Sequence, residues 1–367
     1  MKVDFVPFSE ELAPACRAFN ERLRQGGRPP FLLPEIYKPP RAGRGAIQYT
    51  HYVGVDELGA VRGGVLLMEQ AGWLKGQSIS LMNVQSPLSE GIVDRAFSGV
   101  GLKLLQFLAR RNPYAYAVGM GSEGNPFARL LRGAGWKVAR VPFQFAVIKA
   151  ERFLREIGPL RGGAKGMIAR LLASSGLGAM AFAAWRRRRR YAPPPGYSLE
   201  EIASWPAEVS SVWNCCRDDF HFALTRDACA LEDLHPAWQT RLRRYALRGG
   251  DELLGWSAGL MTQMRDSPYF GNLGVATILD ALAPPAHLEA LLAYTYGALR
   301  DLGADVIVAN FTHDRWRERL GKLGFFGGPS NYLLAISKPL ASALEGGPGG
   351  LGRAYVSRAD GDGRLNL

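Results

Sequence analysis

Carboxylates stand directly after two strand-like apolar runs in the first half of the chain. Glu90 and Asp94 follow one such run, and Glu123 follows the next. A carboxylate at such a place can act as a general base that takes the proton of an attacking amine or hydroxyl group. The alternative is that Glu90 or Asp94 caps the helix that follows, because a side-chain oxygen accepts hydrogen bonds from the free N–H groups of a helix start.

A second group of polar residues follows strand-like runs in the other half of the chain. Asp280 closes one run, and Asn310, Thr312, His313 and Asp314 cluster at the end of the next. If these strand ends are neighbours, His313 and Asp280 form a histidine–carboxylate pair that could serve as the base on the substrate side. The competing interpretation makes Thr312 or Asp314 a helix cap and His313 a surface residue.

No metal site is expected. His221 stands near Asp218 and Asp219, but no second histidine has the spacing of a metal ligand. The four cysteines lack the paired spacing of a zinc site. We interpret them as free thiols of a protein in a reducing cytoplasm. The first residues of the sequence carry acidic side chains and do not resemble a signal peptide.

The elements that must position these residues form an internal repeat. Residues 118–136 match residues 308–325 with one gap, and in both an aromatic residue, a leucine and a glycine recur every four positions. Each copy predicts strand, strand, long helix, strand, short helix and strand, with Gly135 and Gly324 where left-handed helix caps are wanted. The predicted ranges are 61–70, 77–84, 99–111, 115–120, 126–134 and 138–148, then 253–263, 273–279, 284–302, 305–310, 314–323 and 332–336.

Length and composition indicate a globular chain of two domains. The chain has 367 residues, of which 47% are hydrophobic and 21% charged. Of its net charge of +12, the part up to Ala192 holds 29 − 13 = +16, and the rest holds 16 − 20 = −4. A basic N-terminal part favours an anionic partner, such as a nucleotide phosphate, an acidic carrier protein, RNA or an anionic membrane surface, without choosing among them.

A basic and apolar linker separates the two halves. Residues 167–185 are apolar apart from Arg170, and five arginines and three prolines follow. Serines and glycines make this stretch only weakly hydrophobic, so we do not expect a membrane-spanning helix. The segment 167–190 is interpreted as an inter-domain helix or as a peripheral contact with anionic lipid. The predicted domains are 1–150, a linker at 151–195, 196–340, and a glycine-rich tail at 341–367.

The repeat and its layout resemble a tandem GNAT acyltransferase. The resemblance implies an α/β (α+β) fold of two GNAT-like domains, each a mixed, mostly antiparallel sheet flanked by helices. It also implies acyl-CoA as co-substrate, with its pyrophosphate at a helix N-terminus and its pantetheine arm between splayed central strands. The helix start Gly99-Val100-Gly101 matches the family's phosphate loop in its glycines, but Ala96 stands where the family has a polar residue.

The same resemblance implies further site residues. Asn125 could contact the pantetheine arm, or it caps the helix that begins at Pro126. Asn83, Gln85 and Asn310 lie on the central strands, where the acceptor would bind. The corresponding helix start of the second repeat, around Pro285, has no glycine and two prolines, so the first half is the expected donor-binding half.

Several strings resemble more closely an uncharacterised double-GNAT family found beside bacterial exopolysaccharide and exosortase genes. They are FNERLRQGG (19–27), SPLSEG (86–91), GMG (119–121), GAGW (133–136), VPF (141–143), GPSN (328–331) and DGDG (360–363). The resulting hypothesis is a cytoplasmic acyltransferase that moves an acyl group from acyl-CoA or acyl carrier protein to an amine or hydroxyl group of a glycan precursor or amino-acid-like acceptor. The alternatives are a Fem-type aminoacyl-tRNA-dependent transferase and an inactive binding module; nucleic acid is otherwise not expected as a partner.

Overall fold

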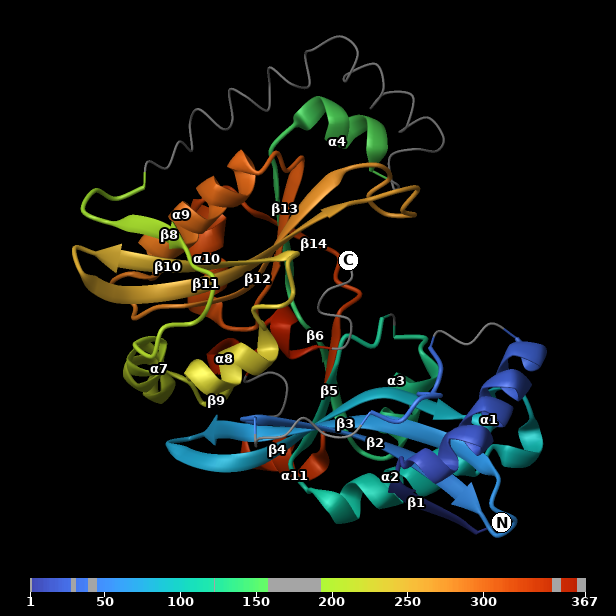
Figure 1. The fold of residues 1–367 in the computed structure, drawn as a ribbon. Coiled ribbons are helices and arrows are strands. Elements are labelled where there is room, and N and C mark those ends of the chain that lie inside the picture. The colour runs from blue at the N-terminus through green and yellow to red at the C-terminus, as the bar shows by residue number, and fades with distance from the viewer. Residues whose placement is uncertain are drawn as a thin grey trace. The chain divides into compact units, whose positions relative to one another are not determined.

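The computed structural model describes residues 2–27, 31–38, 45–121, 123–157, 193–344 and 351–361. The chain divides into two compact units (Figure 1). Unit 1 comprises Met1–Arg140 and Asn331–Gly350, and unit 2 comprises Val141–Ser330 and Leu351–Leu367. Each unit is a mixed sheet flanked by helices, which confirms the predicted fold class (Figure 1).

The sheet of unit 1 runs in the order β1-β2-β3-β4-β5-β15-β6. Its neighbouring strands are antiparallel except for β4 and β5, which are parallel. Its strands are β1 (Val3–Pro7), β2 (Ile47–Asp56), β3 (Val61–Leu74), β4 (Gln77–Ser89), β5 (Ala115–Val118), β6 (Lys137–Arg140) and β15 (Leu333–Ile336). Its helices are η1 (Glu10–Leu12), α1 (Ala13–Gly26), η2 (Glu90–Ile92), η3 (Arg95–Phe97), α2 (Val100–Arg111), α3 (Pro126–Gly133) and α11 (Lys338–Ala343).

Helices α1 and α2 cover opposite faces of this sheet. Val53 packs in one apolar cluster with Phe19 and Leu23 of α1. Its neighbour Tyr52 packs in another cluster with Leu104 and Leu108 of α2. Successive side chains of a strand point to opposite faces, so the two clusters lie on the two sides of the sheet.

The sheet of unit 2 runs in the order β14-β7-β13-β12-β11-β10-β8, and only β12 and β13 are parallel. A short parallel ladder joins β9 to β16. The strands are β7 (Phe143–Val147), β8 (Ser198–Glu201), β9 (Phe222–Leu224), β10 (Leu242–Gly249), β11 (Glu252–Gln263), β12 (Gly274–Leu282), β13 (Val306–Asn310), β14 (Phe326–Gly328) and β16 (Ala354–Tyr355). The helices are α4 (Ala150–Glu156), α7 (Val209–Cys216), η5 (Arg217–Asp219), α8 (Ala228–Leu234), α9 (Leu288–Asp301), α10 (Asp314–Lys322) and η7 (Arg358–Asp360).

Both copies of the repeat end their short helix in the same way. Gly135 and Gly324 have φ of 82° and 89°, and the N–H of the following aromatic residue bonds back to the carbonyl five residues earlier. The acceptors are Leu131 for Trp136 and Leu320 for Phe325. This is the Schellman arrangement, and it confirms the two predicted helix caps.

The predicted strand at 138–148 is wrong as a single element. It breaks at Pro142 into β6, which lies in the first sheet, and β7, which lies in the second. Proline cannot donate to a strand ladder, so a continuous strand is disfavoured there. In return, β15 of the second repeat lies between β5 and β6 of the first sheet. The two repeats have thus exchanged strands.

The compact units therefore differ from the predicted domain boundaries. Residues 141–150 belong to unit 2, and residues 331–350 belong to unit 1. Part of the predicted glycine-rich tail is packed rather than solvated, because Tyr355 and Asp360 are fully buried. Within the described ranges, no helix is long and apolar enough to span a membrane. Most of the predicted linker, including 167–190, lies outside those ranges.

Candidate functional site

The N-terminus of α2 is an open helix start in unit 1. Gly99 is the N-cap, and among the residues that the structure describes no side chain accepts a hydrogen bond from the first turn of α2. Gly99 is exposed, and a Cβ built there would meet no heavy atom within 4 Å. Val100 is fully buried, so the amide of Gly101, together with the helix dipole, is the group that can receive an anion such as a phosphate group.

Neighbouring helix starts lack this openness because side chains cap them. Asp94 accepts a hydrogen bond from the Ala96 amide at 2.9 Å, which makes it the cap of η3. Asn125 accepts one from the Phe127 amide at 2.8 Å and donates to the carbonyl of Met120. Both residues thus occupy the capping roles that the sequence left as alternatives to catalysis and pantetheine binding.

Strands β4 and β5 diverge beyond their short ladder, towards the end of β4 near which α2 begins. Their ladder comprises the pairs Met82–Ala115 and Asn83–Tyr116, and β4 continues to Ser89. Val100 packs close to Gly63, which pairs with Ser89, so the start of α2 lies near the end of β4. The helix start and the diverging strands thus stand together, as the GNAT resemblance implies for a donor site.

Glu90 is held in an ion-pair network just before this helix. Its side chain is buried, and its carboxylate accepts from Arg22 Nε at 2.6 Å and from Arg62 Nη1 at 3.0 Å. Arg62 also donates to Asp56 at 2.7 Å and lies over the ring of Phe97, with its Cζ 4.2 Å from the centroid. This network ties α1 and β3 to the segment that leads into α2, which is a positioning role.

The remaining predicted residues of unit 1 have different surroundings. Glu123 is exposed and pairs with Arg140 at 2.9 Å and with Arg132 at 3.7 Å. Asn83 and Gln85 are buried on β4, and the amide of Gln85 lies 3.8 Å from the sulfur of Met68. Among the three predicted carboxylates here, Glu123 alone is solvent-exposed without capping a helix, and its two arginine partners are exposed as well.

The corresponding helix start of unit 2 does not favour an anion. Helix α9 follows two prolines, which have no N–H to donate, and Glu289 stands in its first turn. Glu289 pairs with Arg319 at 2.5 Å. A carboxylate in the first turn repels an incoming phosphate, so the two repeats differ in this respect.

The C-terminal segment fills the place where the central strands of unit 2 diverge. The ladder of β12 and β13 ends at Ile278–Ala309. Beyond it, Thr312 donates to the Val356 carbonyl, and the Tyr355 hydroxyl bonds to both the carbonyl of Ala281 and the carboxylate of Asp280. The segment that carries β16 thus bridges the two strand ends. It occupies the space that the family resemblance assigns to a pantetheine arm.

A cluster of fully buried charged groups surrounds Asp280. Its carboxylate accepts from Arg226 Nε at 2.7 Å and from the Tyr355 hydroxyl at 2.5 Å, and Arg226 also pairs with Asp360. Burial alone would raise the pKa of Asp280, but the guanidinium of Arg226 holds that pKa below its usual range. Burial raises the pKa of Asp360. Both carboxylates are 0% exposed, so neither is open to a substrate.

The predicted pair of Asp280 with His313 is not the one found in the structure. The histidine beside Asp280 is His235, whose Nε2 lies 3.7 Å from Oδ2. His313 is the N-cap of α10: its Nδ1 accepts from the Arg315 amide at 3.2 Å. Burial, with the nearby positive charge of Arg315, lowers the pKa of His313 to about 4. His313 is therefore a buried neutral cap, in contrast to both sequence-based interpretations.

Asn310 serves the packing of unit 2. It is buried, and its amide donates to the carbonyl of Pro142 at 3.1 Å. Arg226, His235 and Tyr355 were missed by sequence reasoning. They come from three distant segments, and no local pattern around any of them predicts that they meet at Asp280.

Comparisons with known proteins bear on the fold. No protein-family model and no curated protein sequence matches the chain. Among solved structures, a GCN5-related N-acetyltransferase from Anabaena variabilis matches with a TM-score of 0.51 and 12% identity, over 94% of this chain and 75% of that one. A protein of unknown function from Enterococcus faecalis, described as a probable N-acyltransferase, matches with 0.50 and 11%, over 94% and 74%.

These likenesses, with the two mixed sheets, define the class of the molecule as an α+β protein with a GNAT-type acyltransferase fold. Two compact units, each with its own sheet, make it a tandem arrangement of that fold. The matches are at low identity and therefore concern architecture alone. None of them supports the narrower exopolysaccharide-associated family.

Proposed function

We propose that the protein transfers an acyl group from a phosphopantetheine thioester, acyl-CoA or acyl carrier protein, to an amine or hydroxyl group of a small-molecule or glycan-precursor acceptor. The observation that carries this proposal is the open N-terminus of α2 beside the diverging ends of β4 and β5. Unit 1 is the donor-binding half, since unit 2 has a carboxylate at its helix start and Tyr355 between its strand ends.

In the proposed reaction, the acceptor nitrogen or oxygen attacks the thioester carbonyl, a new amide or ester bond forms, and the carbon–sulfur bond breaks. A base removes the proton of the nucleophile, and a proton is returned to the leaving thiolate. We assign the base to Glu123, because Glu90 is buried in its ion-pair network and Asp94 caps η3, whereas the carboxylate of Glu123 is exposed to solvent. Gln85 on β4 is the proposed contact for the acceptor, since Asn83, the other predicted residue of this strand, is fully buried.

The donor site is tested by isothermal titration with acetyl-CoA and a long-chain acyl-CoA. The variants are Gly99→Asp and its uncharged match Gly99→Asn, both of which add a side chain where a Cβ meets nothing within 4 Å. Gly99 is exposed and has a φ of −71°, which any residue adopts, so both variants are expected to fold. The carboxylate that the aspartate variant introduces repels a phosphate, and we expect Gly99→Asp to weaken binding at least tenfold relative to Gly99→Asn.

Two outcomes would contradict the proposal. Equal binding by the aspartate and asparagine variants would place the phosphate elsewhere. Absence of binding to the unmodified protein, repeated with an acylated carrier protein as donor, would exclude a thioester donor altogether. If a donor binds, turnover with a panel of amines then tests Glu123→Gln, which should lower kcat by about 10²-fold or more, on the order of a lost general base.

A further inference from the structure

Residues 351–361 lie in unit 2 as one short stretch of chain that is largely buried. The residues with no exposed surface are Tyr355, Val356, Ser357, Ala359 and Asp360. In sequence the stretch follows GGPGG (346–350), and its regular structure consists of the two residues of β16 and the single turn η7. So short a piece cannot hold its shape by internal contacts, so its contacts with the rest of unit 2 keep it in place.

The backbone of this stretch bonds to the segments beside it. Strand β16 pairs with β9 in a parallel ladder. Beyond the end of β13, the Thr312 amide donates to the Val356 carbonyl at 3.0 Å, and the Val356 amide donates to the Thr312 hydroxyl at 2.9 Å. Buried backbone groups need such partners. The stretch therefore takes the place of a strand partner beyond β13.

Two side chains of the stretch bind the end of β12. The Tyr355 hydroxyl donates to the Asp280 carboxylate at 2.5 Å. Arg226 donates to Asp280 and also pairs with Asp360. The other carboxylate oxygen of Asp360 accepts from the Ser357 amide at 2.8 Å, so both oxygens are engaged. Arg226 thus joins a carboxylate of the sheet to a carboxylate of the stretch.

The charges are arranged so that the stretch is separable from the sheet. Arg226 and Asp280 pair with each other at 2.7 Å, so each keeps an opposite charge whether or not Asp360 is in place. Asp360 passes into water when the stretch leaves. A broken buried salt bridge is costly when it leaves an unpaired buried ion, and this arrangement leaves none. The stretch is therefore held as a ligand is held.

We propose that the cleft between the ends of β12 and β13 is a peptide-binding site whose ligand is the chain's own residues 351–361, the C-terminal strap, and that Arg226 recognises the strap through Asp360. The strap opens and closes as a unit while the sheet of unit 2 stays folded. An occupied cleft excludes a thioester from unit 2, in agreement with a donor site in unit 1. The inference holds whether or not unit 1 binds a thioester.

Hydrogen exchange of the full-length protein measures whether the strap opens by itself. The variant Asp360→Asn keeps the size of the side chain, but its single oxygen cannot serve both the Arg226 and the Ser357 donors on opposite sides. We expect the amides of 354–360 and of Thr312 to exchange at least tenfold faster in the variant, because local opening becomes more frequent. Exchange in β10 and β11 should change less than twofold.

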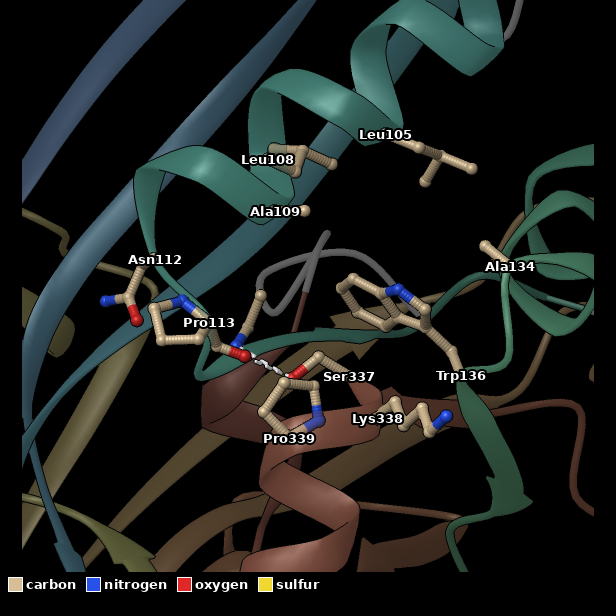
Figure 2. A pocket seen from close by; sticks show the side chains of 11 residues that line it. Leu105, Leu108, Ala109, Asn112, Pro113, Ala134, Trp136, Ser337, Lys338 and Pro339 are labelled. Atoms are coloured by element: carbon tan, nitrogen blue, oxygen red, sulfur yellow. Dashed lines mark hydrogen bonds between the residues drawn. The ribbon is translucent and has the colours of Figure 1, made fainter.

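The matched control is a buried hydrogen bond of unit 1. Ser337 lies in a recess at the start of α11, and its hydroxyl donates to the carbonyl of Pro113 at 2.6 Å (Figure 2). Ser337→Ala removes this bond in the other compact unit. Exchange should then rise around α11 and β5, while exchange of the strap amides should stay within twofold of the unmodified protein.

Fluorescence polarisation tests recognition of the strap directly. The probe is a labelled peptide with the sequence of residues 351–361, and the matched probe carries Asp360→Asn. The full-length Asp360→Asn protein should bind the first peptide at least tenfold more tightly than the unmodified protein does, because the intact strap competes for the same cleft. The matched probe should bind that variant at least tenfold more weakly than the first peptide.

Two exchange patterns in Asp360→Asn would overturn the proposal. Faster exchange throughout unit 2 would make the strap an integral part of the core, and unchanged strap amides would show that Asp360 does not hold it. If Asp360→Asn does not fold, the milder Tyr355→Phe, which removes the hydroxyl bonds to Asp280 and Ala281, is judged by the same pattern. Failure of both variants to fold overturns the proposal.

The peptide experiment can overturn it independently. Absence of peptide binding to the folded Asp360→Asn protein would show that the cleft does not bind the strap as a separate ligand. Equal affinity of the two peptides would show that Arg226 does not recognise the strap through Asp360.

Discussion

Glu90 contributes to stability as the centre of a buried ion-pair network. Arg22 and Arg62 both donate to its carboxylate, and its side chain is 4% exposed. We expect Glu90→Gln to destabilise the protein by about 2 kcal/mol, because removal of one partner of a buried pair leaves the opposite charges incompletely compensated. Urea unfolding of the variant measures this change.

The matched control is Glu21→Gln, which removes an exposed pair with Arg24 on the same helix as Arg22. Exposed pairs contribute little, so this variant should change the free energy of unfolding by less than about 0.5 kcal/mol. If both variants behaved alike, the network around Glu90 would not have the positioning role that its geometry indicates.

His313 should make the protein less stable in mild acid. Its pKa is about 4 when folded, below the ordinary value of 6.5, so the unfolded chain binds the proton more readily. The stability that the neutral imidazole contributes is present above pH 6.5 and is lost as the pH falls from 6.5 towards 4. Between pH 7.5 and 5.0 the loss due to this residue is about 1–2 kcal/mol.

The comparison variant is His313→Asn, which keeps a side-chain acceptor at the N-cap of α10 but does not titrate. Free energies of unfolding at pH 7.5 and 5.0 should fall less in the variant than in the unmodified protein. Equal losses in the two proteins would show that His313 is protonated in the folded state at pH 5.0.

At the scale of elements, the two Schellman caps are necessary for the short helices of the repeat. Gly135 follows α3 with φ of 82°, where any side chain is strained. Gly135→Ala should therefore destabilise by about 1 kcal/mol. Gly133→Ala, inside the same helix and with no atom within 4 Å of the new Cβ, should instead be neutral or stabilising by up to about 1 kcal/mol. Urea unfolding of the two variants distinguishes loss of the cap from steric crowding by the added methyl group. If both substitutions destabilised the protein, crowding would be the cause.

The elements that sequence patterns predicted well are those specified by local chemistry. Apolar periodicity predicts the hairpin of β3 and β4 and helices α2 and α9. The need for a left-handed backbone conformation predicts both glycine caps. Both signals depend only on neighbours in sequence. The exchange of β7 and β15 depends on pairing between residues far apart in sequence, such as Leu334 with Ala139, almost 200 positions away. The charge cluster at Arg226 is equally non-local. The open start of α2 was predictable from its glycines, whereas the partners of Glu90 and Asp280 were not.

At the scale of the whole molecule, the exchanged strands mean that neither repeat is a folding unit by itself. Strand β15 lies between β5 and β6 and pairs with both. A fragment of residues 1–150 contains β5 and β6 but lacks β15. The backbone groups of Tyr116, Ala117 and Val118 that bond to β15 would then lose their partners, and an unpaired central edge is both destabilising and prone to association.

We therefore expect the fragment 1–150 to aggregate or to unfold without a cooperative transition. Residues 1–140 joined through a glycine–serine linker to residues 331–344 restore β15, and this chimaera should unfold cooperatively in urea. A second chimaera, in which Leu334 and Ile336 of the appended strand are replaced by aspartate, supplies the same length without the buried apolar side chains and should behave like the fragment. Circular dichroism and analytical ultracentrifugation of the three proteins measure cooperative unfolding and association. Cooperative unfolding of a monomeric 1–150 fragment would show that the strand exchange is dispensable and that the repeat, not the compact unit, is the folding unit.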